Sequence, residues 1–145
     1  MKFQRGQAIV EFAILLPLFL VLLFGIFYAS MIFANYMTLS SIARSSAREA
    51  AIISSESDYN NNYKKIREKY KDEKLPMDIF DWQATSTENF NIKFDKNSHN
   101  VEVTMKAKLY KSGSQVGNIL NNLAGDSKLA KIDITYSMYS EYTPK

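Results

Sequence analysis

The residue whose type and position most strongly suggest chemistry is Glu11, near the start of the chain. It is the only charged residue between Gln7 and Ala43, and an apolar run begins directly after it. A carboxylate costs about 2.5 to 3.5 kcal/mol at the centre of a membrane and less near its edge. Glu11 therefore either lies among the lipid headgroups, in a first helical turn that favours an acid, or pairs with a cation, because an unpaired buried charge is strongly unfavourable.

No other residues are spaced for catalysis or for holding a cofactor. The chain has no cysteine, which excludes disulfides, thiolate metal sites and cysteine nucleophiles. Its single histidine, His99, falls in a predicted turn where a solvent-facing side chain is expected, and phosphate loops, nucleophile elbows and zinc-ligand spacings do not occur. We predict no catalytic, cofactor-binding or metal-binding residues. A peptidoglycan- or lipid-modifying enzyme would have no residue set to carry its reaction.

The charge balance argues against a nucleic-acid partner. Lysine and arginine number 18 against 15 acidic residues, for a formal net charge of +3, and two of these positives are Lys2 and Arg5. Without these two, 16 basic residues face 15 acidic ones, so the rest of the chain is nearly neutral. It therefore lacks the strong positive field that nucleic-acid binding uses.

An apolar segment, Phe12 to Ala34, is long enough to cross a membrane. Twenty of its 23 residues are hydrophobic, and a spanning helix needs about 20. A cleaved secretory signal peptide is the alternative, but its apolar region typically has about 7 to 15 residues and a small-residue exit. No Gly or Pro occurs from Asn35 to Ile53, so we expect one helix from Gln7 to Ile53, kinked at Pro17.

Positive charges flank both ends of the apolar segment. Lys2 and Arg5 precede it, and Arg44 and Arg48 follow it, so the positive-inside count is nearly tied. The very short N-terminal flank favours a cytoplasmic N-terminus and a C-terminal part outside the cell membrane.

The first residues also form a motif, in which a short basic leader ends in glycine and a glutamate follows five positions later. This arrangement resembles prepilins, which prepilin peptidase cuts on the cytoplasmic side. More narrowly, it resembles the TadE-like minor pilins (pseudopilins) of the Tad (Flp) type IV pilus system. Competence and type II secretion pseudopilins are similar but usually carry Phe directly after the glycine, where this chain has Gln7. The resemblance rests on Arg5-Gly6-Gln7-Ala8-Ile9-Val10-Glu11-Phe12-Ala13, Leu15-Leu16-Pro17 and Phe24-Gly25.

The resemblance implies cleavage between Gly6 and Gln7. Cleavage would remove the leader charges of Lys2 and Arg5 and leave a new amine on Gln7. Glu11, one helical turn further on, would neutralise this amine or that of a neighbouring subunit, and so set the register of assembly.

The resemblance also implies partners and a place in the cell. The partners are prepilin peptidase, other Tad pilus subunits, the inner-membrane assembly platform and, before assembly, membrane lipid. The implied function is assembly of a Tad (Flp) pilus for adhesion or surface colonisation, by a single-pass membrane protein that enters the extracellular pilus after processing. An uncleaved single-pass anchor subunit of a larger envelope complex is the alternative function.

The rest of the chain is patterned as a small mixed domain. A helical spacing of large side chains is found at Tyr59, Tyr63, Ile66 and Tyr70. The segment from Leu75 to Thr87 is a connector in which Trp82 is an aromatic anchor. Three acids near Trp82, namely Asp78, Asp81 and Glu88, lack the spacing of a calcium loop. Alternating residues predict a hairpin of 90–94 with 101–109, a further strand at 132–138 and, between them, a short helix from Ser114 to Gly125.

These elements predict an α+β fold. A long N-terminal transmembrane helix packs against a small antiparallel sheet with short helices, as in pilins, and small residues in 35–53 let the sheet approach. We expect four regions in the chain: a leader (1–6), a hydrophobic assembly helix (7–34), its extramembrane continuation (35–53) and an α+β domain (54–145).

Overall fold

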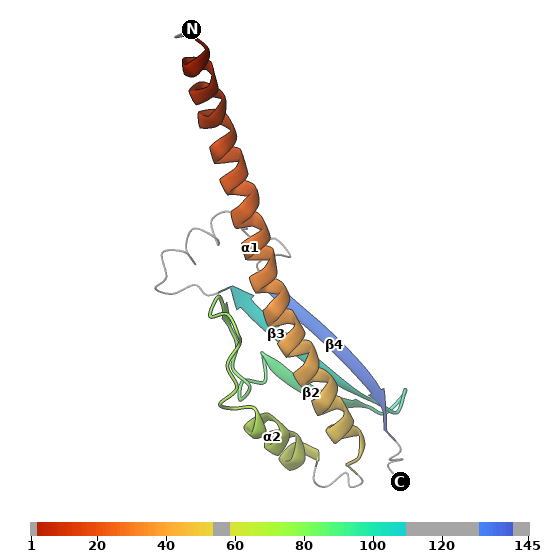
Figure 1. Ribbon diagram of the computed structural model, residues 1–145. Helices are drawn as coiled ribbons and strands as arrows, with labels where there is room; N and C mark the ends of the chain where they lie inside the picture. The colour runs from red at the N-terminus through yellow and green to blue at the C-terminus, as the bar shows by residue number, and fades with distance from the viewer. Residues whose placement is uncertain (1–2, 54–58, 110–130, 141–145) are drawn as a thin grey trace. The chain divides into compact units, whose positions relative to one another are not determined.

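The computed structural model describes residues 3–53, 59–109 and 131–140 and has the predicted α+β arrangement (Figure 1). Contacts divide the chain into an N-terminal unit, residues 1–33, and a C-terminal unit, residues 34–145. In chain order the elements are α1 (Phe3–Ala51), α2 (Tyr59–Lys69), β1 (Phe80–Asp81), β2 (Phe90–Asp95), β3 (Asn100–Leu109) and β4 (Lys131–Tyr139).

Helix α1 confirms the long helix and extends it toward the N-terminus. It begins at Phe3 rather than Gln7, ends at Ala51 rather than Ile53, and is continuous through Pro17. Proline removes one backbone hydrogen bond from a helix interior. The kink expected at Pro17 stays a prediction, and only an interruption of the helix there is excluded.

The sheet is built around β3. Strand β2 pairs antiparallel with β3 from Phe90 opposite Met105 to Asp95 opposite Asn100, and β4 pairs antiparallel along the other edge of β3. Side chains alternate along β3 between buried and outward positions. The hairpin and the strand at 132–138 are therefore confirmed, with one apolar face that needs cover.

The second part of α1 covers this apolar face (Figure 1). Leu39, Ala43 and Ala47 are fully buried, and the two alanines allow the helix to lie close to the strands. The Arg44 guanidinium lies 5.8 Å from the ring centroid of Tyr136 in β4. The Ser140 hydroxyl donates a 3.2 Å hydrogen bond to the carbonyl of Ala51, which satisfies one of the open carbonyls at the end of the helix.

Helix α2 adds to the same core. Tyr63 and Ile66 are buried, as their spacing predicts. Tyr70, just after the helix, donates a 3.1 Å hydrogen bond to the Ser45 hydroxyl and packs its ring 6.3 Å from that of Phe90, between centroids. Tyr63, Ile66 and Tyr70 of this stripe therefore serve packing.

Three expectations need correction or fall outside the described residues. The connector contains a short strand, β1, in which Phe80 pairs with Leu109 and is buried. Two residues are too few to show the alternation that reveals a strand. His99 lies in the expected turn but is half-buried, with φ of 54°, because β4 returns beside it and the Ser140 amide donates to its carbonyl. The helix expected from Ser114 to Gly125 lies outside the described residues.

The Phe90 ring should be the most important single side chain in this core. It is fully buried, whereas Phe94, on the same strand, is half-buried. We expect Phe90→Ala to lower the free energy of unfolding by about 3 to 5 kcal/mol, because it leaves a cavity that neighbours fill only partly. Urea unfolding followed by fluorescence of the single tryptophan, Trp82, measures this in detergent-solubilised protein. A loss no larger than that of Phe94→Ala would contradict the prediction.

Candidate functional site

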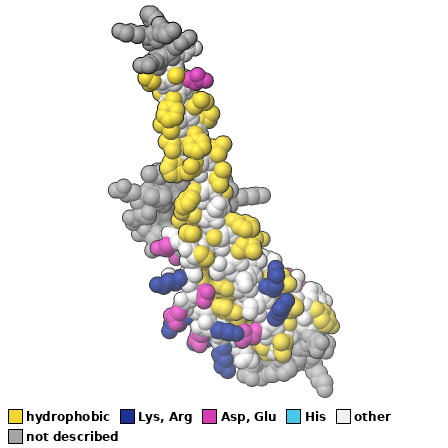
Figure 2. Space-filling model, in the orientation of Figure 1, with side chains coloured by type: hydrophobic (Ala, Val, Ile, Leu, Met, Phe, Trp, Pro, Cys, Tyr) yellow, Lys and Arg dark blue, Asp and Glu magenta, His cyan; other side chains and the backbone are white. Residues whose placement is uncertain are grey.

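The N-terminal unit presents an apolar surface that no other part of the described chain covers. All of its large hydrophobic side chains from Ile9 to Phe27 are exposed, for example Phe12 at 63% and Val21 at 71%. Figure 2 shows hydrophobic side chains over the visible face of this segment. Within the described residues, α1 is the one helix long and apolar enough to cross a membrane. Such a surface in water would be strongly unfavourable, so it requires lipid or protein around it.

Gln7 and Glu11 lie on this helix, both exposed. A separation of four residues places them on one helix face, one turn apart, as the sequence predicts. Glu11 has no hydrogen bond or ion pair within the part of the chain that the structure describes. The backbone of Gly6 and Gln7 is helical, so the predicted scissile bond lies inside the first turns of α1.

Ser30 shows how the apolar segment suits an apolar environment. Ser30 donates its hydroxyl to the carbonyl of Ile26 at 2.9 Å, so this polar group is satisfied within its own helix and needs no water.

Gly25 has open space where a Cβ would stand. Nothing in the described part of the chain therefore requires glycine at this position, although glycine weakens a helix by about 1 kcal/mol relative to alanine.

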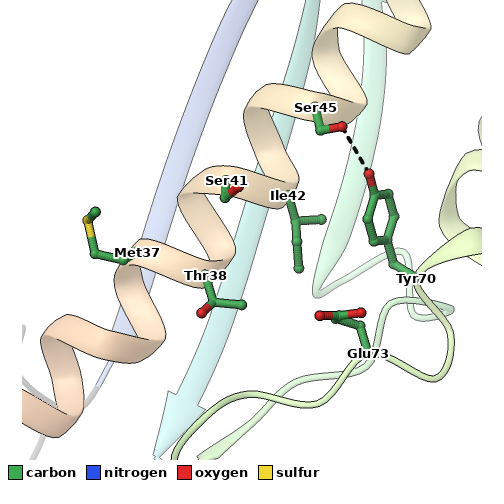
Figure 3. A pocket seen from close by; sticks show the side chains of 7 residues that line it. All are labelled: Met37, Thr38, Ser41, Ile42, Ser45, Tyr70 and Glu73. Carbon is green, nitrogen blue, oxygen red and sulfur yellow. Dashed lines mark hydrogen bonds between the residues drawn. The ribbon is translucent and has the colours of Figure 1, made fainter.

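A shallow groove of about 460 Å³ lies in the C-terminal unit between α1 and the residues after α2 (Figure 3). Its walls carry hydroxyl groups and one carboxylate, from Met37, Thr38, Ser41, Ile42, Ser45, Tyr70 and Glu73. Among the lining residues that the structure describes, Glu73 carries the one carboxylate and none is a histidine. In the same unit, Lys69 pairs with Glu49 at 2.9 Å, and this hydrogen bond raises the pKa of the Lys69 ammonium.

Asn35 is a residue that the sequence did not single out. Its side chain is fully buried, and it makes two hydrogen bonds to the backbone of Met77. The Asn35 amide donates to the Met77 carbonyl at 2.9 Å, and the Met77 amide donates to the Asn35 oxygen at 3.0 Å. Tyr36, the next residue, is 43% exposed. The sequence position of Asn35 could have indicated its burial, because it lies four residues before Leu39 and eight before Ala43, on the helix face that they bury.

Comparison with known proteins bears on this N-terminal part. No curated protein and no solved structure matches the chain. The family model described as TadE-like protein matches residues 6–48, a stretch that holds Gly6, Gln7, Glu11 and Pro17 and lies entirely within α1. The match is consistent with a protein associated with the Tad pilus. Over residues 6–48, the chain is similar to TadE-like proteins.

Proposed function

We propose that the protein is a minor pilin, or pseudopilin, that prepilin peptidase processes and that takes part in assembling a Tad (Flp) pilus for adhesion or surface colonisation. The observation that carries this proposal is the exposed apolar helix of the N-terminal unit, whose first part holds Gly6 and Glu11 within the family match. A helix of this kind needs apolar surroundings, which lipid tails supply in the membrane and neighbouring helices would supply in a filament.

The proposed mechanism starts with a precursor held in the bilayer by the apolar segment. Lys2 and Arg5 keep its N-terminus at the cytoplasmic face, since positive residues favour that side. Cleavage between Gly6 and Gln7 removes both charges and with them the electrostatic hold on that face. The processed chain keeps the apolar segment unchanged.

Extraction then moves the helix from lipid into a bundle of similar helices. Burial of apolar surface is worth about 25 cal/mol per Å² relative to water, so the step is feasible only where the helix never passes through water. Exposed side chains from Ile9 to Phe27 would then pack against neighbouring subunits in place of lipid tails. The inner-membrane assembly platform would supply the force for this exchange.

Cleavage also creates the charge that Glu11 is placed to meet. The new amine of Gln7 lies one helical turn from the Glu11 carboxylate. In an apolar bundle each charge without the other is strongly unfavourable. The pair, within one subunit or between two, would fix the axial register of assembly.

The test is the intact mass and N-terminal residue of the full chain, expressed with and without a matching prepilin peptidase. We expect loss of Met1 to Gly6 only with the peptidase, so that Gln7 becomes the first residue. A control prepilin verifies that the peptidase is active. An uncut chain beside a cut control would overturn the proposal and favour a permanent single-pass membrane anchor.

A further inference from the structure

Three side chains surround α1 at the point where its apolar segment ends. Asn35 is the first residue after Ala34, and Tyr36 and Met37 follow it at 43% and 55% exposure. Met77, held by both hydrogen bonds to Asn35, is 38% exposed. We call Tyr36, Met37 and Met77 the interface ring.

Helix geometry spreads the interface ring around the axis. Successive residues of an α-helix are about 100° apart, so Tyr36 and Met37 point in directions well separated from Asn35, on whose side Met77 lies. In Figure 3 the Met37 side chain extends away from Tyr70 and Glu73. A protein partner would cover one side of a helix, whereas a bilayer surface meets all sides at one level.

The level of the ring follows from the length of the apolar segment. Its 23 residues span about 34 Å at about 1.5 Å per residue, close to the hydrocarbon thickness of about 30 Å. Residues 35–37 therefore fall within the layer of lipid headgroups, about 5 to 8 Å deep on each side. The Asn35 clamp fixes the Met77 backbone within 3.0 Å of its own side chain, so Met77 shares that level.

We propose that the interface ring is a lipid contact of the C-terminal unit, in which Asn35 holds the connector so that Met77 enters the headgroup layer of the bilayer. Tyrosine is enriched at this depth, and methionine is flexible enough to fill irregular apolar space. Exposed Lys74 and Asp78 flank Met77 with one charge of each sign, which suits a layer of zwitterionic headgroups. The inference rests on the membrane span of the proposed function and adds a second, separate contact with lipid.

Single-cysteine variants test the ring, because the chain contains no cysteine of its own. Met77→Cys and Met37→Cys probe the ring, Leu20→Cys the apolar segment, and Ile52→Cys a control site that is 81% exposed. From Asn35 to Ala51 the helix rises about 24 Å, so the control site lies far from the interface ring along α1. Each full-length variant is labelled with bimane and reconstituted at low density in vesicles of phosphatidylethanolamine and phosphatidylglycerol that contain nitroxide lipids.

We expect a headgroup nitroxide to quench the labels at positions 77 and 37 several-fold more than the label at position 52. A mid-chain nitroxide should quench the label at position 20. If position 20 is not quenched, the membrane span itself fails. If position 20 is quenched while position 77 behaves like position 52, the span holds and the interface ring is wrong. Changes at position 77 that follow protein density rather than nitroxide would assign the ring to a second copy and also overturn the inference.

A second variant isolates the role of the clamp. Asn35→Ala removes both hydrogen bonds to Met77 but leaves the helix backbone that carries Met37. We expect it to lower headgroup quenching at position 77 and leave quenching at position 37 unchanged. Unchanged quenching at both positions would refute the clamp.

Discussion

Replacement of Gly6 with leucine is expected to leave the chain uncut by prepilin peptidase, and Gly6→Ala to slow the cut. Proteases need their substrate backbone accessible, but Gly6 and Gln7 lie inside α1. The first turns must therefore unwind before the scissile bond can enter an active site. Glycine lowers the cost of unwinding by about 1 kcal/mol relative to alanine, and it adds no side chain next to the scissile bond. Intact-mass measurement after co-expression with the peptidase reports the cut fraction.

The same helix offers a matched control in Gly25. It has open space at its Cβ position, and Gly25→Ala strengthens the helix by a similar amount without touching the scissile bond. We expect this variant to be cut like the wild type. Equal cutting of Gly6→Leu and the wild type would contradict the prediction. Loss of cutting in Gly25→Ala would instead assign the effect to helix stability or membrane insertion.

Residue patterns predicted most of the fold because most of its elements are long and one-sided. Strand β3 alternates over ten residues between buried and outward side chains, and the helical stripe of Leu39, Ala43 and Ala47 runs over more than two turns. In both elements the periodicity repeats over many residues, so the type of secondary structure can be recognised from the sequence. The cover of the sheet by α1 followed from the same reasoning, since a one-sided apolar sheet needs a partner with small residues.

The features that sequence reasoning missed depend on single contacts between distant segments. Asn35 is polar and would ordinarily be assigned to a surface, yet it is fully buried because its amide matches the backbone of Met77, 42 positions away. Strand β1 has two residues and is defined by its partner, β3, rather than by its own pattern. Buried polar groups are tolerated only when they are hydrogen-bonded, and local sequence does not reveal a distant partner.

For the candidate site, the sequence is more informative than the contacts within the chain. Gly6, Gln7 and Glu11 were assigned from their spacing and their resemblance to a family, and the family match covers all three. The structure adds that Gln7 and Glu11 are both exposed on one helix. Their proposed role depends on a cut chain and on neighbouring subunits, neither of which can be inferred from packing within one chain. For this reason the candidate site is inferred from residue types and their spacing, whereas the fold of the C-terminal unit is explained by its contacts.

Glu11→Gln is expected to abolish incorporation into pili while cleavage continues at the wild-type rate. The substitution keeps the size of the side chain and removes its charge, so the new amine of Gln7 enters an apolar bundle without a counter-charge. Removing one partner of a buried ion pair costs about 3 to 5 kcal/mol, which weakens association by about 100-fold or more at about 1.4 kcal/mol per tenfold change. The measurement is the fraction of subunit in sheared, sedimented pili, with intact mass reporting cleavage in the same cells.

Glu102→Gln serves as the charge control, because Glu102 is an exposed carboxylate on the outward face of β3. It loses the same charge outside the apolar segment, and we expect it to assemble like the wild type. The cause can be separated further in the uncut Gly6→Leu background, where Gln7 has no free amine. There Glu11→Gln should not change the membrane-inserted amount of precursor, because the cation that it would leave unpaired has not been made. Normal assembly of the cleaved Glu11→Gln chain would show that register is set without this pair, and the membrane-edge position of Glu11 would then be sufficient to explain its presence.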